Sequence, residues 1–512
     1  MERIAPPQVN YDNVLPLAIE SRSNRREFLP VNGQTFSNTN GATICRIDVN
    51  ADSMLDASHS YLECQINNTN AQANNDNYLK LNPFSPAWIQ RLRIESGGVV
   101  IEDINEYSRL YSMLMLNQVP ETYIKNNVVN QGMYKPARST NLQTAGVGVV
   151  TLEGTQTARV GANAGDQTSG AAPSVPSELY YPLTAQAILR GSGAIATPAA
   201  AAINQPTAGG LLVHNGQAIR NGQSQVMCIP LVSGFLNMDK YIPLIMMNAG
   251  FTIELTLCDP NRIGVTQREG VGDAGAFLDS AWTITGTKYV AHLIDLDRSF
   301  YDRLRAVMEG SGGVLQLAGQ TYRHFVGDLP SNAGPHTITL PARVKSVKSI
   351  FGTFIDSTQM GNVANFDTSV FQRARLSRFR FEIGSVRYPQ TDVVANTTEN
   401  QAELQKAWGK LGDYSHEQPY SFKHTENDQT ARNGATQNDA LLSAYFLGYD
   451  FEAFQRVALE AGINTADRSL PINFICERTA VMNPANSTRA DFYILSDAIY
   501  YINLDGTVSV SV

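Results

Sequence analysis

Alternating apolar and polar residues dominate the chain, and they predict a protein built mainly of β-strands. In one clear case, Cys45, Ile47 and Val49 alternate with Arg46 and Asp48. Successive side chains of a strand point to opposite faces, so this pattern predicts a strand with one buried and one solvent-facing side. The same period of two recurs in YLECQI (61–66), FTIELTL (251–257) and RFRFEI (378–383).

A helix of four turns is predicted at 295–313, between two stretches that are rich in β-branched and aromatic residues. Those stretches are 282–294 and 314–326. Apolar residues in the helix recur at intervals of four, four and three, which places them on one helical stripe. They are Leu296, Phe300, Leu304 and Val307. Asp297 is placed to cap the start and the glycines after Glu309 end the helix, so it is predicted to connect two β regions.

Two shorter helices are predicted, one in each half of the chain. In the first half, the spacing of apolar residues predicts a short amphipathic helix that lies against a sheet. In the second half, one apolar stripe precedes Gly412, which is expected to end the helix. The stripes are Ile104, Tyr107, Tyr111 and Leu114 in the first helix, and Leu404, Trp408 and Leu411 in the second. Strands, helix and strands therefore follow one another in both halves, which suggests a duplication.

Residues 117–228 interrupt the strand pattern. Between 140 and 225 the chain is dominated by Gly, Ala, Thr, Ser, Gln and Asn, and charges are few. A loop of this length inside a compact domain is normally either disordered or functional. Small neutral side chains suit packing against neighbours better than free disorder, which usually carries more charge. The segment is therefore interpreted as an ordered excursion that projects from the first β domain.

Length and composition agree with two β domains in a soluble protein. The 512 residues exceed the roughly 250–300 at which single cores stop growing. The balance of 39 basic and 47 acidic residues gives a net charge of −8, which argues against a chain-wide nucleic-acid footprint. No apolar run approaches membrane-spanning length and the N-terminus lacks a signal-peptide pattern, so neither a membrane span nor secretion is expected.

The five cysteines are interpreted as buried, reduced packing residues. Most of them stand in strand-like alternation, and their spacing lacks the CxxC and Cys-His patterns of zinc sites. They are Cys45, Cys64, Cys228, Cys258 and Cys476.

No catalytic, cofactor-binding or metal-binding constellation is found in the sequence. The seven histidines form no HExxH spacing, and the glycines in 309–313 and 408–413 lack the phosphate-binding pattern GxxxxGK[ST]. Asp295, Asp450 and Asp497 are interpreted as capping and turn residues, with paired carboxylates for glycoside hydrolysis as the alternative. The chain is therefore predicted not to be an enzyme.

Residues 1–38 lack sustained periodicity and are interpreted as an extended N-terminal arm. The arm carries a basic cluster of Arg22, Arg25 and Arg26. This cluster is a candidate contact with a partner protein, a lipid or a nucleic acid beneath the folded body. The alternative is an ordinary solvated tail.

A second basic patch lies within QRARLSRFRF (372–381). The patch is a candidate contact with a negatively charged partner or a nucleic acid. The alternative is favoured, in which two of the four arginines simply occupy the solvent-facing side of a strand. The four arginines are Arg373, Arg375, Arg378 and Arg380.

Taken together, these segments resemble the double jelly-roll major capsid proteins of the adenovirus-hexon lineage, and they look most similar to those of polinton-like viruses and virophages. The resemblance extends from about residue 40 to the end, in the character and order of the segments. The segments that carry it are DSMLDASHSYLECQI (52–66), WIQRLRIESGGVVIEDINEYSRLYSML (88–114), GFTIELTL (250–257), KYVAHLIDLD (288–297), RFRFEIGSVRYP (378–389), AGINT (461–465) and DAIYYINLDGTVSVSV (497–512).

The resemblance implies an all-β fold of two tandem eight-stranded jelly rolls, with a short connecting helix and a long tower loop in the first. The implied boundaries are an N-terminal arm at 1–38, a first jelly roll at 39–295 with its tower at about 117–228, a connecting helix at 296–313 and a second jelly roll at 314–512.

The resemblance also implies a structural function in the virion of a double-stranded DNA virus. Two barrels in each chain make six in a homotrimer, and such a pseudo-hexameric capsomer can tile an icosahedral shell. The implied partners are further copies of the chain, neighbouring capsomers, and penton and minor capsid proteins. No cofactor or small-molecule substrate is implied, and DNA or a membrane would be met only through the N-terminal arm.

Two other functions fit an all-β composition. A tandem jelly-roll carbohydrate-active enzyme normally has a signal peptide and a cleft lined by carboxylates and tryptophan, whereas this chain has three tryptophans and no leader pattern. A lectin-like receptor-binding module is usually carried on a coiled stalk, and the sequence contains no heptad run.

Overall fold

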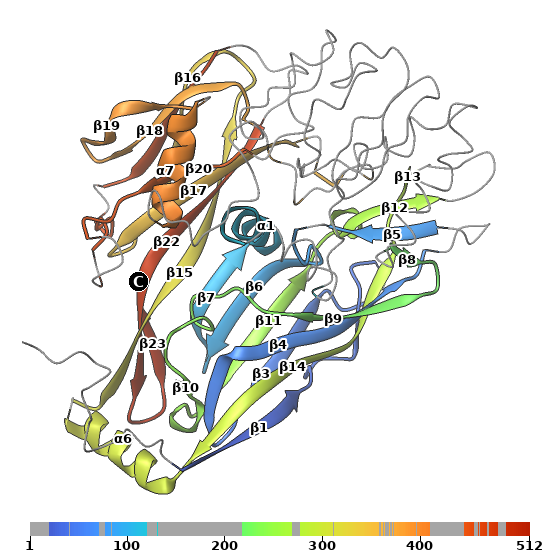
Figure 1. Cartoon of the computed structure of the whole chain (residues 1–512), viewed down its shortest axis with the longest axis vertical. Helices are drawn as coiled ribbons and strands as arrows, with labels where there is room; N and C mark the ends of the chain where they lie inside the picture. Colours follow the sequence, from blue (N-terminus) through green and yellow to red (C-terminus); the bar gives the residue numbers. More distant parts are fainter. Residues whose placement is uncertain are drawn as a thin grey trace, which may run out of the picture.

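The protein contains two β-sandwich units joined by one helix. The computed structural model describes residues 20–119 apart from 40, 71–76 and 83, residue 131, residues 218–310 apart from 269–276, residues 312–409 apart from 396 and short gaps within 358–372, and residues 445–512 apart from short gaps within 455–487. Strands β1 to β14 precede helix α6 (Arg298–Gly310) and form the first unit, and β15 to β23 follow it and form the second. Figure 1 shows the two units side by side, with α6 at one end.

The second unit has the strand order of a jelly roll. Its sheets run β15-β22-β17-β20 and β16-β21-β18-β19, and β23 pairs with β22. Most neighbouring strands, such as β15 and β22 or β16 and β21, are therefore far apart in sequence, as the Greek-key connections of a jelly roll require. The bounds are β15 (Val314–Leu329), β16 (Gly334–Leu340), β17 (Val347–Asp356), β18 (Leu376–Ile383), β19 (Val386–Val394), β20 (Leu447–Asp450), β21 (Ile472–Arg478), β22 (Thr488–Asn503) and β23 (Val508–Ser511).

The first unit repeats this order. One sheet runs β1-β14-β4, with β9 and β10 both paired to β4 and β2 paired to β14, and the other runs β3-β11-β6-β7. A third sheet, β13-β12-β5-β8, extends the unit at one end. The bounds are β1 (Ser21–Phe28), β2 (Thr35–Phe36), β3 (Ile44–Val49), β4 (Met54–Asn68), β5 (Asn77–Leu81), β6 (Ile89–Ser96), β7 (Val99–Asn105), β8 (Ala218–Arg220), β9 (Ser224–Ile229), β10 (Ile242–Pro243), β11 (Phe251–Leu257), β12 (Gly264–Arg268), β13 (Phe277–Leu278) and β14 (Trp282–Leu296).

A helix follows the corresponding strand in each unit. α1 (Tyr107–Gln118) follows β7, and α7 (Thr398–Trp408) follows β19. The repeated order of strands and helix that the sequence suggests is thus present in the fold. None of the helices in the described residues is long and apolar enough to cross a bilayer.

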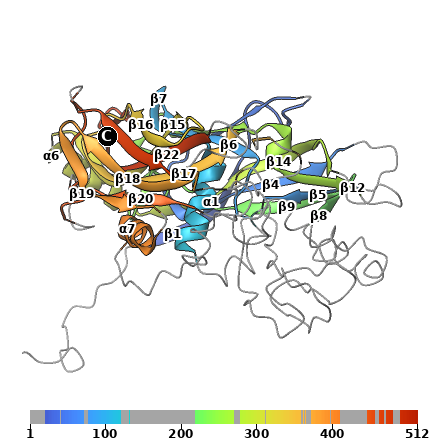
Figure 2. The same cartoon turned by 90° about the horizontal axis from the view of Figure 1, so that it is seen from above.

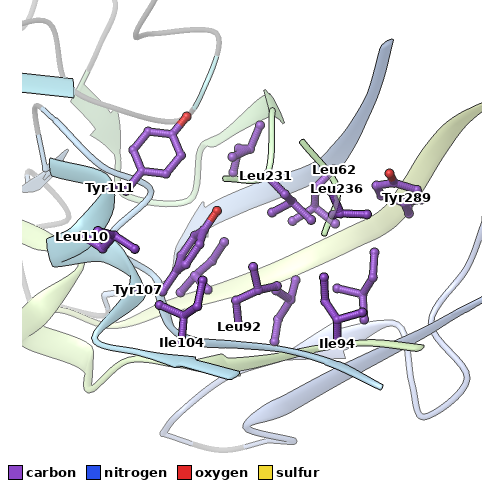
Figure 3. Close-up of a cluster of buried hydrophobic side chains, with 14 of the residues drawn as sticks. Leu62, Leu92, Ile94, Ile104, Tyr107, Leu110, Tyr111, Leu231, Leu236 and Tyr289 are labelled. Carbon is purple, nitrogen blue, oxygen red and sulfur yellow. The ribbon is translucent and has the colours of Figure 1, made fainter. Parts of the chain in front are cut away.

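The predicted alternation of buried and exposed side chains is confirmed. Along β3, Cys45, Ile47 and Val49 are buried, while Arg46 and Asp48 are exposed. The inward side chains of β4, β6, β11 and β14 meet between the two sheets of the first unit. Figure 3 shows part of this core, including Leu62, Leu92, Ile94, Ile104 and Tyr289.

Part of the predicted N-terminal arm is in fact a strand. β1 lies within residues 1–38 and pairs antiparallel with β14, from Ser21 opposite Leu296 to Phe28 opposite Tyr289. Because it is an edge strand in which Phe28 is the one buried residue, its sequence shows no apolar alternation. The first sheet therefore begins at Ser21 and not after residue 38.

Helix α1 is not the amphipathic helix that the apolar spacing predicts. Every residue from Tyr107 to Asn117 is buried, and Ile104 belongs to β7. The face that the spacing assigns to solvent carries Arg109, and it is covered by the second unit. Tertiary packing has therefore overridden the local pattern.

The connecting helix is present as α6, but it begins only at Arg298, Leu296 of the predicted stripe belongs to β14, and the stripe ends at Met308 instead of Val307. Asp297 caps it as predicted, since its carboxylate accepts a hydrogen bond from the Ser299 amide at 3.2 Å. Val307 is 61% exposed, whereas the neighbouring Met308 is buried. The inner face of the helix thus follows the i, i+4 row that ends at Met308.

Three further sequence predictions need correction or lie beyond the described residues. α7 ends at Trp408, with Gly409 as its C-cap, so Gly412 does not end the helix. Cys228 is exposed, because Met227 and Ile229 take the inward positions of β9, while the other four cysteines are buried as predicted. Leu411 and most of the excursion at 117–228 lie outside the described residues.

Candidate functional site: the seam between the two units

Helix α1 lies between the two units, as two perpendicular views show (Figures 1 and 2). We call this region the seam. It comprises α1 with its preceding strand β7 and the loop 231–239 from the first unit, and β15 and β22 from the second. The seam is the candidate functional site because buried charged side chains of both units meet there, among them Arg109, Glu106 and Asp491.

Apolar side chains of both units share one core at the seam. The ring of Phe235 lies edge-on to Phe251 of the first unit, at 5.6 Å between centroids, and to Tyr500 of the second, at 5.1 Å. The same cluster includes Leu317, Tyr493, Ala498, Ile502 and Val508 of the second unit. Aromatic pairs in this geometry add to the free energy gained by burial of apolar area.

The loop 231–239 approaches β15 so closely that only glycine fits at one position. A Cβ atom added to Gly234 would lie 1.6 Å from the carbonyl oxygen of Gln320. The neighbouring Tyr500 hydroxyl donates a hydrogen bond to the same Gln320 carbonyl at 3.1 Å. Backbone contact between the units is therefore direct at this point.

Asp491 in β22 is the fully buried anion at the centre of the seam. Arg109 of α1, which is also fully buried, donates to one of its carboxylate oxygens. The other oxygen contacts the imidazole of His324 at 2.8 Å and the guanidinium of Arg489 at 2.9 Å. Three cationic or polar side chains from two units thus converge on one carboxylate.

Glu106, at the start of α1, is the second buried anion. Its carboxylate is 2.6 Å from Arg262 of the first unit and 3.1 Å from Arg489 of the second. Arg489 therefore bridges the two carboxylates. Glu106 has a left-handed backbone with φ of 50°, which is unusual for a residue other than glycine. Its carbonyl accepts a hydrogen bond from the Tyr493 hydroxyl at 2.9 Å, so β22 holds this turn in place.

Both anions stay charged because of the surrounding cations. Burial alone raises the pKa of Glu106, but the charges of Arg262 and Arg109 outweigh it and lower that pKa from 4.5 to about 2. Burial likewise opposes ionisation of Asp491, and the charge of Arg109 with the hydrogen bond from His324 lowers its pKa well below the ordinary value. The network is thus a set of ion pairs near neutral pH.

Glu102 in β7 behaves differently, because no guanidinium is bonded to it. Its carboxylate accepts hydrogen bonds from Ser233, from the Gly234 amide at 3.1 Å and from Thr321 of the second unit at 3.1 Å. Burial raises its pKa above the ordinary value despite these donors. It ties the loop 231–239 to β15.

This arrangement is suited to holding two units together. Each seam carboxylate accepts hydrogen bonds from donors of the chain itself. Within the described residues, no group of three or more His, Cys, Asp and Glu side chains is positioned to bind a metal ion.

Of the three carboxylates that are predicted to serve in caps and turns, only Asp450 does so, because Asp295 and Asp497 lie within the strands β14 and β22. Asp295 accepts a hydrogen bond from Asn24 at 2.5 Å, and Asp450 accepts one from the Glu452 amide at 2.9 Å, as a turn residue does. Asp497 is paired with Lys348 at 3.3 Å. The three carboxylates are not assembled into one site.

The predicted basic cluster lies on the exposed edge strand β1. Arg25 is paired with Glu27 at 2.9 Å, and Arg26 lies over the ring of Phe28 at 5.0 Å. Arg22 is exposed beside them. Of the second patch, the exposed Arg378 pairs with Glu477 across the sheet, as expected for the solvent-facing side of a strand.

Sequence reasoning missed the residues of the seam. A weak signal was present, because Arg109 interrupts the apolar run YSRLYSMLML and Asp491 precedes FYIL. Charged residues inside apolar segments are seldom fully buried unless they are paired. The partner of each lies 382 residues away, so the pairing itself could not be read from local spacing.

We predict that Asp491→Asn destabilises the protein strongly. The substitution leaves Arg109 as a buried charge without its counter-ion, which typically costs about 3–5 kcal/mol. Chemical denaturation of the full chain measures this loss. Asp328→Asn, an exposed position on the adjacent strand β15, is the matched control and should change stability by about 0.5 kcal/mol or less. Equal effects of the two substitutions would contradict the role of Asp491.

We predict that Gly234→Ala loosens the seam. The added methyl group has no room beside Gln320, and forcing an atom into a packed site typically costs about 1–3 kcal/mol. Gly310→Ala is the control, because a Cβ there meets nothing within 4 Å. Thermal unfolding should therefore show a lower midpoint for the first variant and an unchanged or slightly higher one for the second.

Acid is predicted to weaken the seam. A carboxyl group whose folded pKa is depressed stabilises the fold above its unfolded pKa and loses that contribution as the pH falls towards the folded value. For Glu106 this loss of stability occurs as the pH falls from 4.5 to about 2. The contribution of Glu102 to stability changes in the opposite direction as the pH falls, because its folded pKa is raised. Unfolding midpoints measured between neutral and acidic pH should fall less for Glu106→Gln than for the wild type, and more for Glu102→Gln.

Comparisons with known proteins agree with this architecture. No protein-family model matches the sequence, and a search of curated proteins finds no match. A chain of the PBCV-1 virus capsid is 9% identical, with 98% of this chain and 99% of that chain covered and a TM-score of 0.54. The Faustovirus major capsid protein is 9% identical, with 96% and 92% covered and a TM-score of 0.53.

A chain of the Sputnik virophage is 10% identical, with 100% of this chain and 93% of that chain covered and a TM-score of 0.53. At sequence identities this low, the structural matches establish the fold alone. Their coverage shows that the shared fold extends over nearly the whole of both chains. Together with the strand order of both units, these matches show that the chain has an all-β fold of two jelly rolls in tandem.

Proposed function

We propose that this chain is a viral major capsid protein, located in the capsid shell of the virion. The observation that carries the proposal is the match over more than nine tenths of both chains to the Faustovirus major capsid protein and to a chain of the PBCV-1 capsid. Such coverage includes both jelly rolls and their connection, so it concerns the whole architecture and not one common module. The function is then geometric, and it needs no catalytic residue.

The seam supports this proposal. A tile must hold its two barrels at one fixed angle, and the buried ion pairs of Asp491 and Glu106 are satisfied only when the units meet in one arrangement. In this proposal the first jelly roll begins with β1, α6 is the connection, and β15 to β23 form the second jelly roll. Three copies would form a pseudo-hexameric trimer that contacts neighbouring capsomers and penton and minor capsid proteins.

The basic cluster of the N-terminal segment keeps its proposed role as an inner contact. Arg22 and Arg26 are exposed on β1, and Arg25 is partly engaged by Glu27. We expect Arg22 and Arg26 to contribute more than Arg25 to a contact with a partner, DNA or a membrane. No observation on the described residues favours the carbohydrate-active or lectin-like alternatives.

We predict that the purified chain is a stable trimer. Obligate interfaces commonly bury about 2,000–5,000 Å² or more, so dissociation at micromolar concentration is not expected. Light scattering should give about 168 kDa, which is three times the chain mass of 55.9 kDa. Negative-stain images should show particles with a six-cornered outline and three-fold symmetry. A monomer of 55.9 kDa without such particles would contradict the proposal.

A further inference from the structure

A polar groove of about 610 Å³ opens at the seam between β7, β15 and β23. Arg323 and Arg343 line it, together with His324, Phe325 and Val100. The groove is therefore built from both units, and its shape depends on how they are joined.

The two arginines of the groove are not neutralised by carboxylates of the described chain. Arg323 is partly buried, and its guanidinium donates to the backbone carbonyl of Arg343 at 3.3 Å. Burial lowers the pKa of Arg323, which reflects a charge that is desolvated without an anionic partner. The Arg343 side chain is exposed, and neither guanidinium has an ion pair with a described residue.

The acidic side chains of the groove are already engaged elsewhere. Asp103 is bonded to Arg91 at 2.7 Å, and the Glu102 carboxylate is held by Ser233 and Thr321. His324 is bonded to Asp491. The groove thus presents two guanidinium groups that have no carboxylate partner among the described residues, and the partly buried Arg323 is costly to desolvate unless an anion completes the site.

Part of the groove lining is apolar. Val100, Phe325 and Val510 contribute to it, and Val100 is 40% exposed. Arginine beside exposed apolar and aromatic side chains is the composition of protein interfaces. A phosphodiester backbone would gain little from the valines, so a polypeptide with a carboxylate fits the groove better than a nucleic acid does.

We propose that this groove is a contact between copies of the chain, in which a carboxylate-bearing segment of a second copy lies across Arg323 and Arg343. This inference rests on the proposed capsid function and deepens it by naming one contact surface. A second copy is the occupant because the chain carries 47 acidic against 39 basic residues, and so each copy offers an excess of carboxylates. Ion pairs between guanidinium and carboxylate then complete the desolvated site.

The test compares self-association of the full chain with that of two groove variants. Arg343→Glu reverses an exposed charge with little risk to folding, and Arg323→Gln removes the half-buried one. Lys240→Glu is the control, because it makes the same charge reversal at an exposed loop position. Oligomer size and shell assembly are measured by light scattering over a range of protein concentrations, at low and high salt, after thermal unfolding has confirmed that each variant is folded.

We expect Arg343→Glu to raise the protein concentration needed for half-maximal association by about tenfold or more, because removing one partner of a close charge pair slows association and speeds dissociation. Arg323→Gln should act in the same direction, and Lys240→Glu should match the wild type. High salt should weaken self-association of the wild type, so that it approaches the self-association of the variants.

Unchanged association of Arg343→Glu would overturn the groove contact. If that variant instead binds a double-stranded DNA fragment more weakly while its association is unchanged, the occupant is a nucleic acid and the proposal is wrong. A wild-type chain that stays monomeric would contradict the proposed function itself, so the two failures are distinguishable.

Discussion

The ion pair between Arg109 and Asp491 is the constraint on which the rest of the structure depends. Both side chains are fully buried, one in a helix of the first unit and the other in a strand of the second. Either charge alone would be expensive to remove from water, so each unit needs the other in one fixed position. The direct contact of Gly234 with Gln320 imposes the same position through the backbone. The two jelly rolls are therefore held in one arrangement.

This constraint accounts for a difference in burial between the equivalent helices of the two units. Helices α1 and α7 hold equivalent places in the strand order, yet α1 is buried along its length while α7 keeps partly exposed positions beside its buried Leu404 and Trp408. The difference follows from the seam, because only α1 is enclosed between sheets of both units in the described chain. The two units thus share a strand order, and the helix at the interface between them carries buried charges that hold it in place.

The same geometry connects structure with function. In the proposed capsid function, the shape of the chain and the surfaces that meet other copies carry the role. The seam holds the two units in one arrangement, and the groove at Arg323 leaves cationic groups that the described chain does not neutralise. Under that proposal, buried cations paired within the chain stabilise the fold, and those left unpaired at the groove contribute to association.

The sequence by itself determined the strands and the class of fold. Alternation along segments such as 44–49 and 378–383 depends only on the two-residue period of a strand, and the cap and glycines of α6 are local signals. Tertiary structure decided what these elements bury. β1 carries no alternation because it is an exposed edge, and α1 loses its solvent face to a strand that lies almost 400 residues away in sequence. Long-range packing creates the seam, and the local spacing of residues cannot predict which distant residue will pair with a buried charge.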